Sequence, residues 1–151
     1  MHSFTNIWLH LIFSTKDRLP FITDSFESNL HKHIKNKLIE DYDSHVECIN
    51  GYNDHIHILM KQSQNYAIKD IVKNIKGESS HWINQCNFTK EKFVWQTGYA
   101  AFSLSIDKVT AVKKYIESQK EHHKKISYLE EIIKYLKIYG LDEKTVETFL
   151  N

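Results

Sequence analysis

The sequence predicts an α+β domain of the ferredoxin-like kind, with a four-stranded antiparallel sheet and additional helices at the C-terminus. Segments with the pattern of strands and segments with a helical period follow one another in the order βαββαβ. A short turn, Gly51 to Asp54, joins the second and third strands as a hairpin. No linker or internal repeat divides the 151 residues, so we expect a single domain, with a core at about 6–125 and a helical tail at about 127–151.

The first half of the chain contains three of the strands and one helix. Apolar residues spaced by four predict the helix, Thr23 or Asp24 is its expected N-cap, and Asp41-Tyr42-Asp43 ends it. The two hairpin strands are rich in apolar residues on either side of the turn. In chain order, the expected bounds are 6–14 for the first strand, about 24–40 for the helix, and 44–50 and 55–61 for the hairpin strands.

The second half contains the fourth strand and several helices. One apolar face predicts a helix up to about Gln85, and Asp107 is the expected N-cap of a later helix that runs to His123. Gly140 is expected to end the next helix. In chain order, the expected bounds are 67–85 for a helix, 86–100 for an irregular stretch, 101–105 for a strand, 107–123 and 129–138 for two helices, and 145–150 for a final turn that the pattern allows.

Composition excludes several classes of protein. With 41% hydrophobic residues, one proline and four glycines, the chain is expected to be ordered throughout. A net charge of +1 does not by itself indicate a polyanionic partner. Charge is nevertheless uneven, because 107–125 holds six lysines and three acidic residues, whereas 127–151 holds three lysines and five acidic residues. A solvated helix face would also explain these lysines.

The chain carries no sign of export. Cys48 and Cys86 lack the spacing of a metal or redox pair, which suits free thiols in a reducing compartment. The apolar N-terminal stretch lacks a basic leader and contains His10, so we expect a strand there and not a signal peptide. No stretch approaches the roughly 18 apolar residues of a membrane span. We therefore expect a cytoplasmic protein.

The segment His55-Ile56-His57 predicts half of a metal site. A strand places alternate side chains on one face, so both imidazoles would lie on the same side of the sheet, about 7 Å apart along the strand. Held on a strand, the pair would also be rigidly placed. A pair of structural, hydrogen-bonded histidines is the alternative, and on this motif alone it is the more common one.

A second group of polar residues lies on the expected 107–123 helix. Tyr115, Gln119 and His122 follow one another at i, i+4 and i+7, along the border of the apolar stripe of that helix. Residues at such a border can contact both the core and a bound substrate. A tyrosine whose ring is in the core and whose hydroxyl is in water is the alternative for Tyr115.

Taken together, these motifs resemble those of the single-tyrosine HUH transposases, the small IS200-like enzymes of bacterial insertion sequences, including their REP-associated relatives. Each match is short, but their order and spacing are specific, and they run from about Asn6 to His123. The matching stretches are His10 to Arg18, Gly51 to His57, Ile71 to Gly77 with Ser79, Trp95-Gln96 before Gly98-Tyr99, and Gln119 followed by His122-His123.

The resemblance implies a reaction and a site. Tyr115 would be the nucleophile that attacks a DNA phosphate, forming a 5′-phosphotyrosine intermediate and a free 3′-OH, followed by strand transfer. His55, His57 and Gln119 would hold a divalent metal ion, Mg²⁺ or Mn²⁺, which aligns the phosphate. This describes a transposase, an enzyme that cleaves and joins DNA strands by transesterification.

The resemblance also implies partners. Single-stranded DNA containing a hairpin would be the substrate, and family members act as dimers, so a homodimer is expected, with Tyr115 working in cis or in trans. His10 and His122 would lie near the site without binding metal, and His123 is expected to be structural. Candidates for DNA contacts are Lys69, Lys73, Lys76, Lys113, Lys120 and Lys124 for the backbone, and Trp95 and Tyr99 for the bases. Solvated lysines and a core position for Trp95 are the more common alternatives.

Two rival functions remain open on the sequence. A non-catalytic module that binds single-stranded nucleic acid would explain the lysines and aromatic residues, and the ferredoxin-like fold hosts such modules. It would not explain two histidines, a tyrosine and a glutamine in this order. A domesticated REP-associated endonuclease would keep the same site, and only the DNA that flanks the gene would distinguish it.

Overall fold

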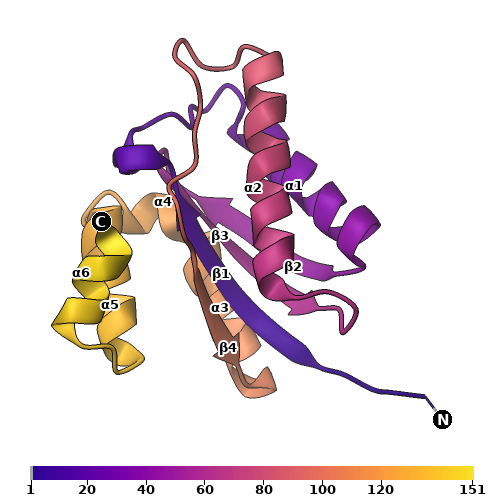
Figure 1. The fold of residues 1–151 in the computed structure, drawn as a ribbon. Coiled ribbons are helices and arrows are strands. Elements are labelled where there is room, and N and C mark those ends of the chain that lie inside the picture. Colours follow the sequence, from indigo (N-terminus) through magenta and orange to yellow (C-terminus); the bar gives the residue numbers. More distant parts are fainter. Residues whose placement is uncertain (1) are drawn as a thin grey trace.

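The computed structural model describes residues 2–151 and contains one four-stranded antiparallel sheet with helices on both faces (Figure 1). The order of the strands across the sheet is β2-β3-β1-β4, and every neighbouring pair is antiparallel. The predicted α+β fold class is therefore confirmed. The strands are β1 (Ile7–Ser14), β2 (His45–Gly51), β3 (His55–Gln62) and β4 (Ala100–Leu104).

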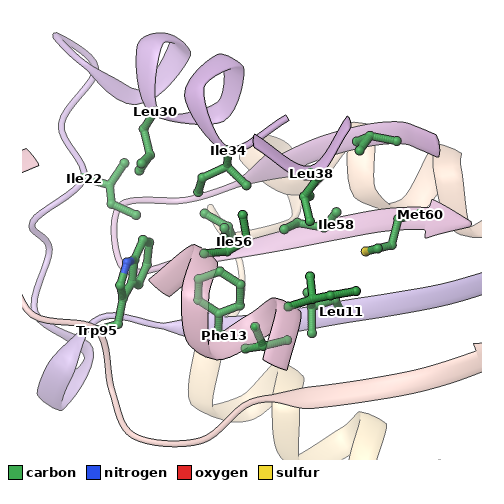
Figure 2. Close-up of a cluster of buried hydrophobic side chains, with 14 of the residues drawn as sticks. Leu11, Phe13, Ile22, Leu30, Ile34, Leu38, Ile56, Ile58, Met60 and Trp95 are labelled. Carbon is green, nitrogen blue, oxygen red and sulfur yellow. The ribbon is translucent and has the colours of Figure 1, made fainter. Parts of the chain in front are cut away.

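One face of the sheet is covered by α1 (Glu27–Tyr42) and α2 (Ile68–Gln85). Figure 2 shows side chains of α1, such as Leu30 and Ile34, pointing toward Ile56 on β3 and Phe13 on β1. These residues are almost completely buried, and their removal from water is the main force that joins the helices to the sheet.

The opposite face carries the remaining helices. Trp8 and Leu59 of the sheet pack against Ile116 of α3, while Ile12 and Phe102 pack against the C-terminal helices. Side chains alternate along a strand, so this face also receives the odd-numbered residues of β3, including both candidate metal ligands. The helices here are α3 (Val109–Glu117), α4 (Gln119–His122), α5 (Tyr128–Ile138) and α6 (Glu143–Leu150).

The start of α1 differs from the prediction. Neither Thr23 nor Asp24 caps the helix, which begins at Glu27 with Phe26 in the N-cap position. The backbone carbonyl of Thr23 instead accepts from the N–H groups of Phe26 and Glu27, and its hydroxyl lies 2.7 Å from that of Ser25. The Thr23 side chain therefore bonds within a turn that precedes the helix and does not cap α1.

The predicted helix over 107–123 is wrong in its continuity and in its cap. The structure has a 3-10 turn, η2 (Ile106–Lys108), then α3, and a break at Ser118 before α4. Asp107 accepts from the Ser105 hydroxyl at 2.5 Å instead of capping α3. At the break, the Asn50 amide donates to the carbonyls of Ile116 and Glu117 at 2.9 and 3.2 Å, so these groups bond to the hairpin.

The other elements agree with the prediction to within two residues, and the final turn that the pattern allowed is the helix α6, which begins two residues earlier. A short 3-10 segment, η1 (Lys16–Arg18), follows β1. Cys48 and Cys86 are free thiols. Across residues 2–151, the structure contains no helix that is both long and apolar enough to cross a membrane.

Candidate active site

Two buried histidines on β3 form the base of the site. His55 and His57 lie on the same face of the sheet, as strand alternation predicts, with ring centroids 5.1 Å apart and no exposed surface. The hairpin turn passes very close to the first of them, since a Cβ built on Gly51 would lie 2.1 Å from the His55 carbonyl oxygen. Only glycine fits there, so Gly51 allows the turn that positions His55.

A third histidine joins this pair from the end of α4. The His123 ring lies 4.5 Å from that of His55, and its Nδ1 donates to the Ile126 carbonyl at 2.9 Å. The Nδ1 of His55 donates to the Asp54 carboxylate at 2.7 Å. These bonds orient both rings, so that each Nε2 points into the site.

Buried His10 on β1 supports His57 from the neighbouring strand. Its Nε2 lies 2.7 Å from the His57 Nδ1, and the two rings are stacked. Burial lowers the pKa of His57 to about 4 and that of His10 to about 3, so both rings are neutral at pH 7. Neutral imidazole is the form that binds metal.

Glu131 of α5 places a carboxylate at the centre of the three histidines. Its Oε1 lies 2.9 Å from the Nε2 of His57, 3.5 Å from that of His55 and 3.4 Å from that of His123. The side chain is 1% exposed. Burial alone would raise the pKa of this carboxyl group, but hydrogen bonds from His123 and His57 hold it well below its ordinary value.

Gln119 completes the cluster. Because the helix breaks at Ser118, Gln119 is fully buried, and its Oε1 lies 3.0 Å from the His55 Nε2 and 2.8 Å from the His123 Nε2. Its Nε2 donates to Glu131 Oε2 at 3.0 Å. The amide oxygen is thus placed among the histidines, as the metal-ligand hypothesis requires.

The arrangement of donor atoms suits a metal ion. In His55, Nδ1 is already a donor, so in the neutral ring Nε2 is an acceptor that faces the acceptor oxygens of Gln119 and Glu131. A cation among these atoms would remove that conflict. Ligand atoms of His55, His57, His123 and Glu131 all lie within 4.8 Å of one another. Neighbouring ligands of an octahedral ion bound at 2.0–2.1 Å are roughly 2.9 Å apart. The imidazole nitrogens here lie 2.8–3.5 Å from the oxygens of Gln119 and Glu131. This group could therefore bind a metal ion.

Tyr115 lies directly beside the cluster. Its hydroxyl donates to Glu131 Oε2 and lies 3.3 Å from the Nε2 of His122, which is partly exposed. Burial and the nearby Glu131 charge raise the pKa of Tyr115 well above its ordinary value. The candidate nucleophile, the histidines and the glutamine are thus brought together in one chain, and His10 and His122 lie next to them.

The sequence interpretation missed two members of the cluster. His123 was expected to be structural, but its Nε2 faces the same point as those of His55 and His57. The sequence does not predict Glu131 as a member, because it has no spacing relation to the histidine motif. One signal could have revealed it, since Glu131 interrupts the buried stripe of Tyr128, Ile132 and Leu136 on α5. A charged residue within an apolar stripe requires a buried partner.

The lysines that were candidates for DNA contacts have different environments. Lys69 and Lys73 are exposed on α2. Lys76 is partly buried, with its Nζ donating to the carbonyls of Gln96 and Gly98 at 2.5 and 2.7 Å, and burial lowers its pKa to about 8. The other three pair with carboxylates: Lys113 with Glu47 at 3.0 Å, Lys120 with Glu27 at 2.8 Å and Lys124 with Glu121 at 2.8 Å.

The two aromatic candidates lie against the α1–α2 side of the protein. Trp95 is 6% exposed, and its Nε1 donates to the Ser79 hydroxyl at 2.9 Å. Tyr99 is partly buried against the same core. A role of either residue in base stacking stays a prediction.

Comparison with known proteins identifies relatives of the chain. The family profile described as "Transposase IS200 like" matches residues 3–119. The ISDra2 transposase TnpA of Deinococcus radiodurans is 29% identical over 115 residues, which are 73% of this chain and 81% of that protein. His123 and Glu131 lie beyond the part of the chain that the profile matches.

Two solved structures have a similar fold. A Deinococcus radiodurans protein described as a transposase matches with a TM-score of 0.63 and 21% identity, covering 79% of this chain and 95% of that one. A REP-associated tyrosine transposase bound to a REP hairpin matches with a TM-score of 0.60 and 12% identity, covering 82% of this chain and 72% of that one.

Proposed function

Since the chain belongs to the IS200-like transposase family, we propose that it cleaves and joins single-stranded DNA through Tyr115, with the help of a divalent metal ion. One observation carries this proposal. A single carboxylate, that of Glu131, contacts both the Tyr115 hydroxyl and the histidine cluster, so the nucleophile and the candidate metal ligands are separated by no more than one small group. A phosphate group of similar size could make both contacts.

The metal ligands that we propose are His55, His57 and Gln119, with His123 adding a third imidazole. Asp54, His10 and the Ile126 carbonyl orient the imidazoles through their Nδ1 atoms. A bound Mg²⁺ or Mn²⁺ would withdraw charge from an oxygen of the scissile phosphate. Amide and carboxylate oxygens suit these ions, although imidazoles also bind Zn²⁺ or Ni²⁺.

In the proposed reaction, the Tyr115 oxygen attacks the phosphorus atom. A bond from Tyr115 to phosphorus forms as the bond to the 3′ oxygen breaks, and the proton lost by the phenol is balanced by the proton gained by the 3′ oxygen. The phosphotyrosine keeps the energy of a phosphodiester, so the 3′-OH of another DNA end can reverse the step and join the strands. Neither ATP nor a water nucleophile is required.

The proposed substrate is single-stranded DNA that contains a hairpin. Support comes from the family and from the similar fold of the REP-associated transposase, which was solved bound to a REP hairpin. A homodimer, expected from the resemblance, stays a prediction that light scattering would test. The Tyr115 hydroxyl contacts Glu131, which contacts His57 of the same chain, so we propose that one chain holds all the parts of the site.

The test uses end-labelled oligonucleotides that cover the DNA on both sides of the gene. With Mn²⁺ present, we expect a protein–DNA adduct that survives SDS and carries the 3′-terminal label, because the protein joins the 5′ phosphate at the break. The other product should end in a 3′-OH that a polymerase can extend. EDTA should prevent both. Tight binding without an adduct would instead support the non-catalytic module.

A further inference from the structure

The Glu131 carboxylate occupies the place that a scissile phosphate needs. A phosphate in the proposed reaction must present one oxygen to the metal and its phosphorus atom to Tyr115. Glu131 presents Oε1 to His55, His57 and His123, and Oε2 to the Tyr115 hydroxyl. The two groups are both anionic and similar in size, so they cannot occupy this place together.

With α5 in position, the site is closed. His55, His57 and Gln119 have no exposed surface, and Glu131 is 1% exposed. A cavity of about 210 Å³ is lined by Tyr115, His122 and Glu131 but not by His55, His57 or Gln119, and Lys134, Tyr135 and Ile138 of α5 form part of its wall. A DNA strand could therefore not reach the histidines unless α5 moves.

Displacement of α5, which carries Glu131, would leave the strand pairing of the sheet intact. The tail, residues 127–151, contributes no strand, and Figure 1 shows α5 and α6 as a pair at the side of the sheet away from α1 and α2. Each helix has its own cap: Ser127 accepts from the N–H of Glu130, and Asp142 from that of Thr145. The tail packs on the sheet mainly through one apolar cluster, which includes Ile12 and Phe102.

The tail carries a net negative charge, as a nucleic acid does. It carries five acidic and three basic residues, whereas 107–125, which contains Tyr115, carries six lysines and three acidic residues. Charge complementarity of this kind favours docking of the tail when DNA is absent, and DNA would compete for the same basic segment.

We propose that Glu131 is an internal metal ligand that takes the place of the scissile phosphate in the DNA-free protein, and that single-stranded DNA must displace it together with α5 before cleavage. The proposal rests on the proposed function, because it assigns the substrate's place in the same site. It predicts that the tail has a closed state with metal and an open state with DNA.

The first test measures the metal ligand without any DNA. Mn²⁺ is titrated into the full chain by calorimetry, comparing wild type with Glu131→Gln and with Glu130→Gln, an exposed neighbour on the same helix. We expect Glu131→Gln to weaken Mn²⁺ binding at least about 10-fold, and Glu130→Gln to leave it unchanged. If Glu131→Gln fails to fold, Glu131→Asp keeps the charge but shortens its reach, and it should also bind Mn²⁺ more weakly. Unchanged affinity in a folded variant overturns the proposal.

The second test measures displacement of the tail. Hydrogen exchange of α5 amides is followed in the Mn²⁺-loaded wild type, with and without the flanking-DNA oligonucleotides. We expect protection of 128–138 to fall when DNA binds, and the Glu131→Gln protein to form adduct faster than the Glu130→Gln protein. Full protection of α5 in the adduct, or slower adduct formation by Glu131→Gln, overturns the proposal. If no variant forms an adduct, the proposed function fails, yet the Mn²⁺ titration still tests whether Glu131 is a ligand.

Discussion

Replacing Trp95 with leucine separates a role in the core from a role in DNA stacking. The indole lies between Phe13 and Phe93, with ring centroids 4.9 and 4.7 Å away, and donates to the Ser79 hydroxyl. Leucine keeps apolar bulk, so the variant should fold, but it removes the hydrogen bond and every aromatic contact.

The expected loss follows from these contacts. One hydrogen bond contributes about 1 kcal/mol, and each edge-to-face aromatic pair about 0.5–1.5 kcal/mol beyond its buried area. Together they predict that Trp95→Leu lowers the free energy of unfolding by about 2–4 kcal/mol. The Ser79 hydroxyl keeps its bond to the Lys76 carbonyl at 3.3 Å, so no large additional penalty is expected.

Urea unfolding measures the free energy of unfolding of the wild type and of Trp95→Leu. Fluorescence anisotropy measures the affinity of each protein for single-stranded DNA, without urea, under conditions in which the variant is folded. We expect Trp95→Leu to be less stable by the amount given above, and its affinity for DNA to stay within about twofold of that of the wild type. A stacking residue would instead lose about 1–3 kcal/mol of binding, or roughly 5- to 150-fold. A stability change below about 1 kcal/mol together with such a loss of affinity would refute the core placement.

Two further predictions concern the metal and the lysines. His57→Ala should reduce adduct formation at least about 100-fold. It should also abolish the rise in melting temperature that Mn²⁺ causes in the wild type. Full activity of the wild type in EDTA would rule out a role for the metal. Replacing Lys69 and Lys73 with glutamine should lower the slope of log K against log salt by roughly 1.4, or 0.7 per phosphate contact. Lys76→Gln is the matched control, because the Lys76 ammonium already donates to two carbonyls. A salt slope that falls only in this control would contradict the assignment of Lys69 and Lys73 to phosphate contacts.

The fold could be predicted from sequence because its signals are local. Strand alternation sets the face on which His55 and His57 lie, and the apolar stripe of α2 sets the face that it buries. The break after α3 could not be predicted in this way, since it depends on Asn50, more than sixty residues earlier in the chain, bonding to the helix end. That distant contact lies at the break that immediately precedes Gln119.

The site was predictable only as far as its motif extends. His55, His57, Tyr115 and Gln119 follow a pattern of spacing, and the structure brings all four together. Glu131 enters through the packing of α5 on the sheet, which no spacing encodes. Its position within a buried stripe is a sign of a buried partner, but only the tertiary structure identifies that partner as the histidine cluster.

The most direct measurement is to identify which residue carries the DNA. Four tyrosines lie near the histidines: Tyr115, Tyr128, which stacks on His55 at 4.6 Å, Tyr135, whose ring is 5.5 Å from that of Tyr115, and Tyr52, which stacks on His123 at 5.5 Å. Mass spectrometry of the trapped adduct after nuclease and protease digestion should locate the nucleotide on Tyr115. Tyr115→Phe should then form no adduct while binding the same DNA with nearly unchanged affinity. A nucleotide on Tyr52, Tyr128 or Tyr135, or an adduct formed by Tyr115→Phe, would contradict the assignment of the nucleophile.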